Sequence, residues 1–421
     1  MAVVDTISSP VMTTADGTPL KVSLQRTNRR KRIQAFLLVT PLLLFIGVSF
    51  LLPIADMIFR AVENPQVVNI MPRTSAALVN WDGQELPDES IFAALVADLA
   101  EGRETREIGK VATRLNYESS GMRSLIMKSA RRAGRIETGP YQEAMIDIDE
   151  DWADLDTWKL IQRESDPFTA SYFLAAVDMR YNADGEIVDQ PDYQQIYVKL
   201  FIRTLWISLV IMGFTLLLGF PVAYLLATLP ARISNLLMIL VLLPFWTSLL
   251  VRTTSWIVML QTQGVLNDLM VWLGLIADES RLQMIYNRTG TIVAMTHILL
   301  PFMILPLYSV MKGISPSYVR AARSLGANQL TAFVKVYLPL TVPGIGAGSI
   351  LVFILAIGYY ITPALVGGQS GQLISNSIAY HMQESLNWGL AAAIGAILLF
   401  AVLALYLIYN KIVGVDNMKL G

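Results

Sequence analysis

Long apolar segments separated by polar stretches dominate the chain. The hydrocarbon core of a membrane is about 30 Å thick and is crossed by about 20 apolar helical residues, and six segments are long enough. They are Ile33–Ala55, Thr204–Leu229, Ile233–Leu260, Thr289–Met311, Thr341–Val366 and Trp388–Asn410. The pattern predicts an all-α polytopic membrane protein with six transmembrane helices. An even number of spans places both termini on the same side.

The longest polar stretch, residues 59–199, separates the first two spans. Helical patterning at 90–100 and 121–133 predicts a small, mostly helical insert domain. The acidic run at 147–151 could attract cations or a basic partner, or it could begin a helix, where the helix dipole favours negative charge. The predicted organisation is listed in chain order: tail 1–32, first helix 33–58, insert 59–199, five-helix core 200–413 and tail 414–421.

A second polar stretch, residues 312–340, lies between the fourth and fifth spans. Ser315 and Pro316 predict the start of a short helix, because a serine oxygen caps the first turn and proline suits its first position. Gly326 supplies a left-handed residue at the end of that helix, and Asn328 can cap a second one. An organised surface element just outside the bilayer predicts a docking site for another protein.

Composition supports a membrane location and shows how charge is distributed. The 421 residues are 54% hydrophobic and only 15% charged, which excludes an ordinary soluble protein of this size. Residues 60–199 carry 25 acidic and 15 basic side chains, whereas the remainder carries 8 and 17. Basic residues gather beside the spans in both tails and in the 312–338 loop. The positive-inside rule therefore places these segments in the cytoplasm and the insert outside.

The sequence predicts no catalytic chemistry within this chain. It has no phosphate-binding G-x-x-x-x-G-K-[ST] loop, no cysteine, and only two histidines, His297 and His381, which are far apart. We therefore expect no bound cofactor, no metal site and no nucleic-acid partner, and energy for active transport must come from another subunit. His297 is expected to be a packing or hydrogen-bonded residue.

Polar residues within or beside the spans are candidates for a substrate path, because ionisable groups in a membrane usually face a cavity or a neighbour. Arg252 could line the path, pair with Asp56 or extend toward the outer surface. Tyr359 and Tyr360 could present aromatic faces to a cationic substrate or anchor the helix at the interface. The complete set of candidates is Asp56, Trp246, Thr247, Ser248, Arg252, Tyr359 and Tyr360.

The 312–340 loop resembles the "EAA" coupling loop of permease subunits in type I ABC importers. The residues that match the family pattern are Ala321, Ala322, Gly326, Val336, Leu338 and Pro339. Arg320 stands where the family usually has glutamate, so a salt bridge that relies on that acid is not expected. The resemblance implies that the loop docks into a cleft of a cytoplasmic ATPase subunit. Ala321, Ala322 and Gly326 would then allow close approach, and Arg320 and Arg323 would make polar contacts.

Further segments resemble the spermidine/putrescine-type branch of this family. They are Leu243–Trp256, Gly264–Leu269, Leu300–Tyr308, Gly358–Gly368 and Asn387–Leu399. The resemblance covers about residues 33–58 and 200–413 but not the insert. It implies a bacterial inner-membrane complex with a second, paralogous permease, two ATPase subunits that bind ATP and magnesium, and a periplasmic solute-binding protein.

The resemblance implies that this chain is not an enzyme but a permease that imports polyamines by alternating access. Alternative solutes are an opine, ferric ion, and an amino-acid-like or phosphonate compound. A membrane-anchored receptor or scaffold with an external ligand domain is the alternative of another class. It would require a cytoplasmic signalling domain, whereas only eleven residues follow Asn410.

Overall fold

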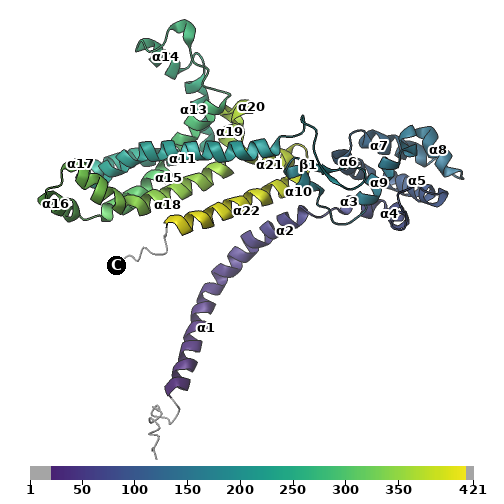
Figure 1. The fold of residues 1–421 in the computed structure, drawn as a ribbon, viewed down its shortest axis with the longest axis horizontal. Coiled ribbons are helices and arrows are strands. Elements are labelled where there is room, and N and C mark those ends of the chain that lie inside the picture. The colour runs from purple at the N-terminus through teal and green to yellow at the C-terminus, as the bar shows by residue number, and fades with distance from the viewer. Residues whose placement is uncertain (1–19, 414–421) are drawn as a thin grey trace, which may run out of the picture. The chain divides into compact units, whose positions relative to one another are not determined.

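The computed structural model describes residues 20–413, and they form two units, one ending at Phe59 and the other beginning at Arg60. The tail 414–421 and residues 1–19 of the predicted N-terminal tail lie outside the described residues. Between them the chain is almost entirely helical, with one two-stranded sheet among the described residues. The predicted all-α polytopic fold is confirmed (Figure 1).

The first unit is one long helical segment. It consists of α1 (Leu20–Ile46), a π-helical turn η1 (Gly47–Leu51) and α2 (Leu52–Arg60), whose last residue is the first of the second unit. In the turn the N–H of Leu52 reaches the carbonyl of Gly47, five residues back, directly before Pro53, which has no N–H to continue the regular ladder. Asp56, a predicted path residue, lies on α2.

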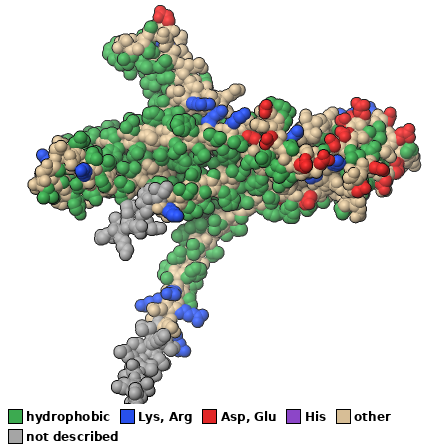
Figure 2. Space-filling model, viewed as in Figure 1, with side chains coloured by type: hydrophobic (Ala, Val, Ile, Leu, Met, Phe, Trp, Pro, Cys, Tyr) green, Lys and Arg blue, Asp and Glu red, His purple; other side chains and the backbone are tan. Residues whose placement is uncertain are grey.

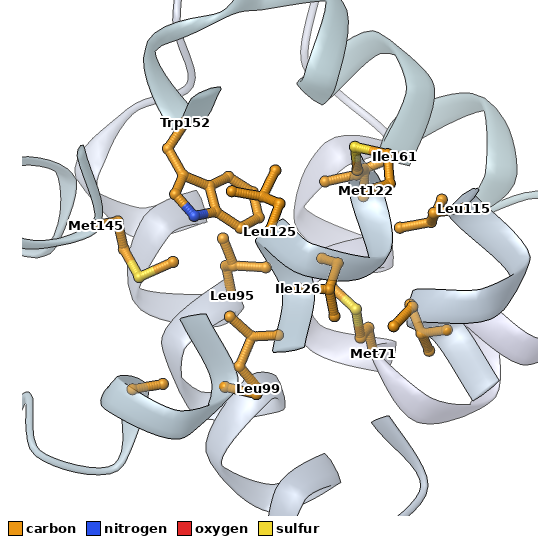
Figure 3. Close-up of a cluster of buried hydrophobic side chains, with 14 of the residues drawn as sticks. Met71, Leu95, Leu99, Leu115, Met122, Leu125, Ile126, Met145, Trp152 and Ile161 are labelled. Carbon is orange, nitrogen blue, oxygen red and sulfur yellow. The ribbon is translucent and has the colours of Figure 1, made fainter. Parts of the chain in front are cut away.

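The insert is a helical domain with its own apolar core. Its elements are α3 (Pro65–Ile70), α4 (Pro72–Leu78), α5 (Glu89–Glu104), α6 (Ile108–Glu118), α7 (Met122–Ala133), α8 (Tyr141–Ile148), η2 (Glu150–Ala153), α9 (Leu155–Glu164), α10 (Ser171–Ala176), β1 (Met179–Tyr181) and β2 (Ile187–Asp189). Trp152 is fully buried in the core beside Leu95, Leu125 and Met145 (Figure 3). Trp158 is fully buried in the same core. The predicted helices at 90–100 and 121–133 are confirmed within a few residues.

The acidic run of the insert begins a helical turn. The carboxylate of Asp149 accepts the N–H of Asp151 at the start of η2 and pairs with Lys128 at 2.7 Å. The hydrogen bond from Lys128 lowers the pKa of Asp149. These contacts support the helix-start interpretation of this run for Asp149 rather than the cation-binding one.

The membrane core follows the insert. Its elements are α11 (Tyr197–Thr228), α12 (Ala231–Leu242), η3 (Leu243–Trp246), α13 (Leu249–Leu260), α14 (Val265–Trp272), η4 (Asp278–Ser280), α15 (Arg288–Gly313), α16 (Pro316–Ser324), α17 (Gln329–Ala332), η5 (Phe333–Tyr337), α18 (Leu338–Gly358), α19 (Ile361–Val366), α20 (Gly368–Gly371), α21 (Ile374–Gln383) and α22 (Trp388–Val413). Helices α11, α15 and α18 pack side by side around a shared apolar core (Figure 1). Hydrophobic side chains cover the outside of these helices (Figure 2).

Two predicted spans differ from the structure. Among residues 20–413, five helices are long and apolar enough to cross a membrane, and a bent pair would make a sixth span. The predicted third span, 233–260, is that pair, and its helices meet at 98°. Thr247 is extended at the break, and the hydroxyl of Ser248 caps the new helix by accepting the N–H of Val251. The predicted third span is therefore two helices joined at a bend rather than one continuous helix.

The predicted fifth span, 341–366, also breaks, at Tyr359 and Tyr360. Pro363 has no N–H to bond the carbonyl of Tyr359, and its ring would clash with that carbonyl in a continuous helix. The Tyr359 carbonyl accepts the hydroxyl of Ser375 instead, at 2.6 Å, and the Tyr360 carbonyl accepts the amide of Asn376 at 2.8 Å. The helix α18 therefore ends at Gly358.

Candidate functional site

The loop between α15 and α18 is a compact two-helix element whose ends are capped as the sequence predicts. Ser315 caps α16 by accepting the N–H of Ser317, and Asn328 caps α17 by accepting the N–H of Thr331. Gly326 has a φ of +89° and follows α16 in the left-handed conformation. Its N–H bonds the carbonyl of Arg323, and the next N–H bonds the carbonyl of Ala322, which is the Schellman arrangement.

The loop has an exposed apolar face. Leu325 is 89% exposed and Leu330 is 72% exposed, and Tyr318 and Val334 are exposed beside them in the sequence. We call these four residues the loop face. None of these four was among the predicted site residues, although a leucine directly before the terminal glycine is a signal that could have been used. Large apolar side chains on a solvent-exposed loop indicate a surface that binds another protein.

Aromatic contacts fix the loop to the membrane core. The ring of Phe333 packs edge-on against Phe220 and Tyr224 of α11 at 6.2 and 6.1 Å, and Tyr337 packs against Tyr224 at 5.4 Å. Lys312, near the end of α15, donates to the carbonyl of Ala227, near the end of α11, at 3.4 Å. The loop is therefore packed against α11 in addition to its chain connections to α15 and α18.

The predicted coupling residues divide between exposed and packed positions. Arg320, Ala321 and Arg323 are exposed on α16, Gly326 and Pro339 are exposed after it, and Ala322, Val336 and Leu338 are partly buried. A Cβ added to Gly326 would meet no atom within 4 Å. Within this chain the left-handed backbone, rather than close approach of a neighbour, therefore requires glycine at this position.

A polar cluster lies within the membrane core, where α13, α15 and the α18–α19 break meet. Trp256 donates its indole N–H to Nδ1 of His297 at 3.1 Å, so His297 is hydrogen-bonded, as predicted. The hydroxyls of Thr253 and Thr362 lie 3.3 Å apart. Arg252 lies four residues before Trp256 on α13, one helical turn away.

Arg252 has no counter-charge among the described residues of the membrane core. Its Nε is buried without a hydrogen-bond partner, and no ion pair joins it to a carboxylate of residues 200–413. Among residues 200–413 the acids are Asp268, Asp278, Glu279 and Glu384. The last three lie outside the candidate spans, and Asp268, near the end of the bent pair, is paired with Arg281 at 2.7 Å. A positive charge in a membrane span without a partner indicates a functional position.

The structure brings only part of the predicted path together. Arg252 lies one turn from Trp256 on α13, Tyr359 and Tyr360 lie at the break between α18 and α19, and Trp246 is 73% exposed on η3. The hydroxyls of Thr247 and Ser248 bond the backbone at the bend. Trp256, Thr253 and Thr362 were missed. Trp256 could have been found from its spacing of four residues from Arg252, which places both on one helix face. Among the described residues, no group of three or more acidic or histidine side chains could hold a metal.

Comparison with known proteins identifies the family. Residues 201–413 match the family described as the binding-protein-dependent transport system inner membrane component. The spermidine/putrescine transport system permease protein PotB of Salmonella typhimurium is 34% identical over 226 residues, which are 54% of this chain and 78% of that protein. PotB of Haemophilus influenzae is 36% identical over 218 residues, 50% of this chain and 76% of that protein.

A more distant relative and a solved structure are also similar. The inner membrane ABC transporter permease protein YdcU of Escherichia coli is 33% identical over 226 residues, 51% of this chain and 71% of that protein. A bacterial ABC transporter for alginate import is 22% identical, with a TM-score of 0.43 over 52% of this chain and 81% of that chain. On the family match and the PotB relatives, the chain belongs to the binding-protein-dependent transport system inner membrane component family, as a type I ABC importer permease of the spermidine/putrescine branch.

Proposed function

We propose that this chain is one permease subunit of an ATP-driven importer that carries polyamines into the cytoplasm by alternating access. The loop face is the observation that carries the proposal, because it presents exposed apolar side chains on a capped, anchored loop at one end of the core. The insert joins α11 at the opposite end of the same helix (Figure 1). The two surfaces would then face opposite sides of the membrane.

The proposed assembly assigns a partner to each surface. Two ATPase subunits, which bind ATP and magnesium, dock from the cytoplasm, one of them on the loop face, with Arg320 and Arg323 available for polar contacts. A second, paralogous permease encloses the path with this chain. A solute-binding protein delivers the substrate from the periplasm, and both termini are cytoplasmic. ATP drives the cycle because it binds one conformation more tightly than the other.

The proposed substrate class follows from the relatives and from the aromatic residues near the breaks in the third and fifth spans. The PotB relatives are named as spermidine/putrescine permeases. Trp246, Trp256, Tyr359 and Tyr360 supply aromatic faces of the kind that attract cations. Arg252 favours a second candidate, an importer of a small solute that carries an anionic group, such as an opine, amino-acid-like or phosphonate compound.

The test is substrate-stimulated ATP hydrolysis by the complex purified with its neighbouring subunits in lipid nanodiscs. The solute-binding protein is loaded in turn with putrescine, spermidine, ferric ion and an opine. Stimulation by the polyamines alone is expected. Stimulation by another solute would retain the importer and replace the substrate. An intact permease that co-purifies with no ATPase would overturn the importer itself and favour a receptor or scaffold.

A further inference from the structure

The insert touches the outer end of the sixth span through two tyrosines. Gly389 lies in the first turn of α22, and a Cβ added there would lie 2.4 Å from the ring of Tyr172 on α10. Glycine at this position therefore lets the ring lie directly against the helix backbone. Tyr117 of α6 donates its hydroxyl to the carbonyl of Ser385, just before α22, at 2.9 Å. Two separate helices of the insert thus contact this corner.

The insert also caps the start of the second span with a side chain. Asp178 lies between α10 and β1, is buried, and has a φ of +61°. One carboxylate oxygen accepts the N–H groups of Ile196 and Tyr197 at 3.0 and 2.9 Å, and the other accepts the N–H of Val198 at 2.9 Å. The first turn of a helix leaves its N–H groups without partners, so one side chain of the insert satisfies the beginning of α11.

A buried hydrogen-bonded chain joins these two places within the membrane core. The hydroxyl of Tyr197 lies 2.8 Å from Nε2 of His381, and Nδ1 of His381 lies 2.8 Å from the hydroxyl of Ser385. Tyr197 and His381 are both buried. The start of α11, the helix α21 and the corner before α22 are therefore held together directly beneath the contacts of the insert.

The tyrosine against α22 is fixed within the core of the insert. The guanidinium of Arg114 lies 4.7 Å from the centre of the Tyr172 ring. Arg114 is itself held by Glu164, Glu118 and Asn64 at 2.5 to 2.8 Å. Neither Arg114 nor Glu164 is exposed by more than 2%. Tyr172 thus packs on one side against the buried, ion-paired Arg114 of the insert and on the other against α22.

We propose that the insert is a positioning element of the transport cycle, which holds the outer ends of α11 and α22 as one rigid body through Tyr172 and Asp178. The insert then moves with this corner and does not swing on a hinge. The inference rests on the proposed importer function, because alternating access requires the outer ends of the spanning helices to move in fixed groups. Loosening the joint would let ATP hydrolysis proceed with less solute carried for each ATP.

An engineered disulfide tests this joint, since the chain contains no cysteine of its own. In the double variant Tyr172→Cys with Gly389→Cys, the new Cβ at 389 lies 2.7 Å from the former position of Cδ2 of the Tyr172 ring, two bonds from the Cβ of residue 172. The two Cβ atoms are therefore at most about 5 Å apart, close to the roughly 3.5–4.5 Å that a disulfide spans. Under reducing conditions the joint lacks its ring contact. We expect solute uptake per ATP to fall several-fold, with the complex still assembled, and to recover to within about twofold of the parent on oxidation.

Other outcomes would overturn the proposal. If oxidation abolished uptake and a reductant restored it, the insert would have to part from α22 during the cycle. If uptake per ATP were unchanged in the reduced variant, the joint would not position the helices. Tyr193→Cys, at an insert tyrosine that is 80% exposed, is the matched control and should leave coupling unchanged. Each result is the ratio of solute uptake to ATP hydrolysed, measured on a complex that hydrolyses ATP. If the importer assignment itself were wrong, the parent complex would show no ATP hydrolysis, so the two failures are distinguishable.

Discussion

Two arginines, Arg114 in the insert and Arg252 in the membrane core, show how differently the two regions accommodate a positive charge. Arg114 is 2% exposed and bonds Asn64, Glu118 and Glu164. Arg252 is partly buried, and its Nε is buried without a partner. A buried charge is costly unless it is paired. The insert therefore satisfies its own charges, whereas the described core leaves one to be satisfied by water, substrate or another subunit.

The exposure of tryptophan side chains differs between the two regions in the same way. In the insert, Trp152 and Trp158 are fully buried and charged side chains cover the outside (Figure 2). In the core, Trp246 is 73% exposed and Trp272 is 80% exposed. An apolar surface of this extent is stable only against lipid or another protein. The insert folds as a domain in water does, and the core is completed by its surroundings.

Removing the paired arginine should produce the largest loss of stability. Arg114→Ala leaves Glu164 buried without its main counter-charge, and breaking such a pair costs about 3–5 kcal/mol. Hydrogen exchange of insert peptides in the intact complex measures the loss. Lys110→Ala is the matched control on the same helix, because its pair with Glu107 is exposed and such pairs contribute less than about 1 kcal/mol. Equal losses of stability in the two variants would mean that the buried arginine of the insert does not depend on its ion pairs, and the contrast with Arg252 of the core would fail.

The unpaired arginine should behave in the opposite way. Arg252→Gln breaks no ion pair among the described residues, so the unfolding midpoint of the complex should stay the same or rise. Under the proposed function a cation no longer has to pass this positive charge, so the KM for spermidine uptake should fall several-fold.

Arg288→Gln provides the control for that experiment, since Arg288 bonds the carbonyl of Ser370 in the same core. Its KM should match that of the parent. A loss of stability in Arg252→Gln as large as that in Arg114→Ala would mean that Arg252 has an acidic partner outside the described core, and the comparison would fail.

The sequence predicts features that depend on local rules and misses those that depend on distant contacts. Ser315, Gly326 and Asn328 cap helices as expected, because a cap needs only residues a few positions away. The breaks in the third and fifth spans were not predicted, since each span lies in one long apolar run. The fifth ends where it does partly because Ser375, sixteen residues later, bonds the freed carbonyl of Tyr359.

The joint between insert and core could not be predicted for the same reason. Tyr117 and Ser385 are 268 positions apart, and neither carries a motif. In the sequence Gly389 looks like one more small residue in an apolar helix. Only the Tyr172 ring that lies against it explains why glycine stands at this position. The pairing of Arg114 with Glu164 is likewise invisible in a sequence that offers many acids in the same insert.

Gly326 gives the smallest expected effect and separates conformation from contact on the loop face. Alanine would meet no atom within 4 Å but would have to adopt a φ of +89°, which costs about 1 kcal/mol. Asparagine tolerates this conformation better. Co-purification of the ATPase should therefore weaken about fivefold in Gly326→Ala and less in Gly326→Asn, although asparagine is larger. The reverse order would mean that the ATPase packs directly on Gly326 and that close approach, as the family resemblance implies, requires the glycine.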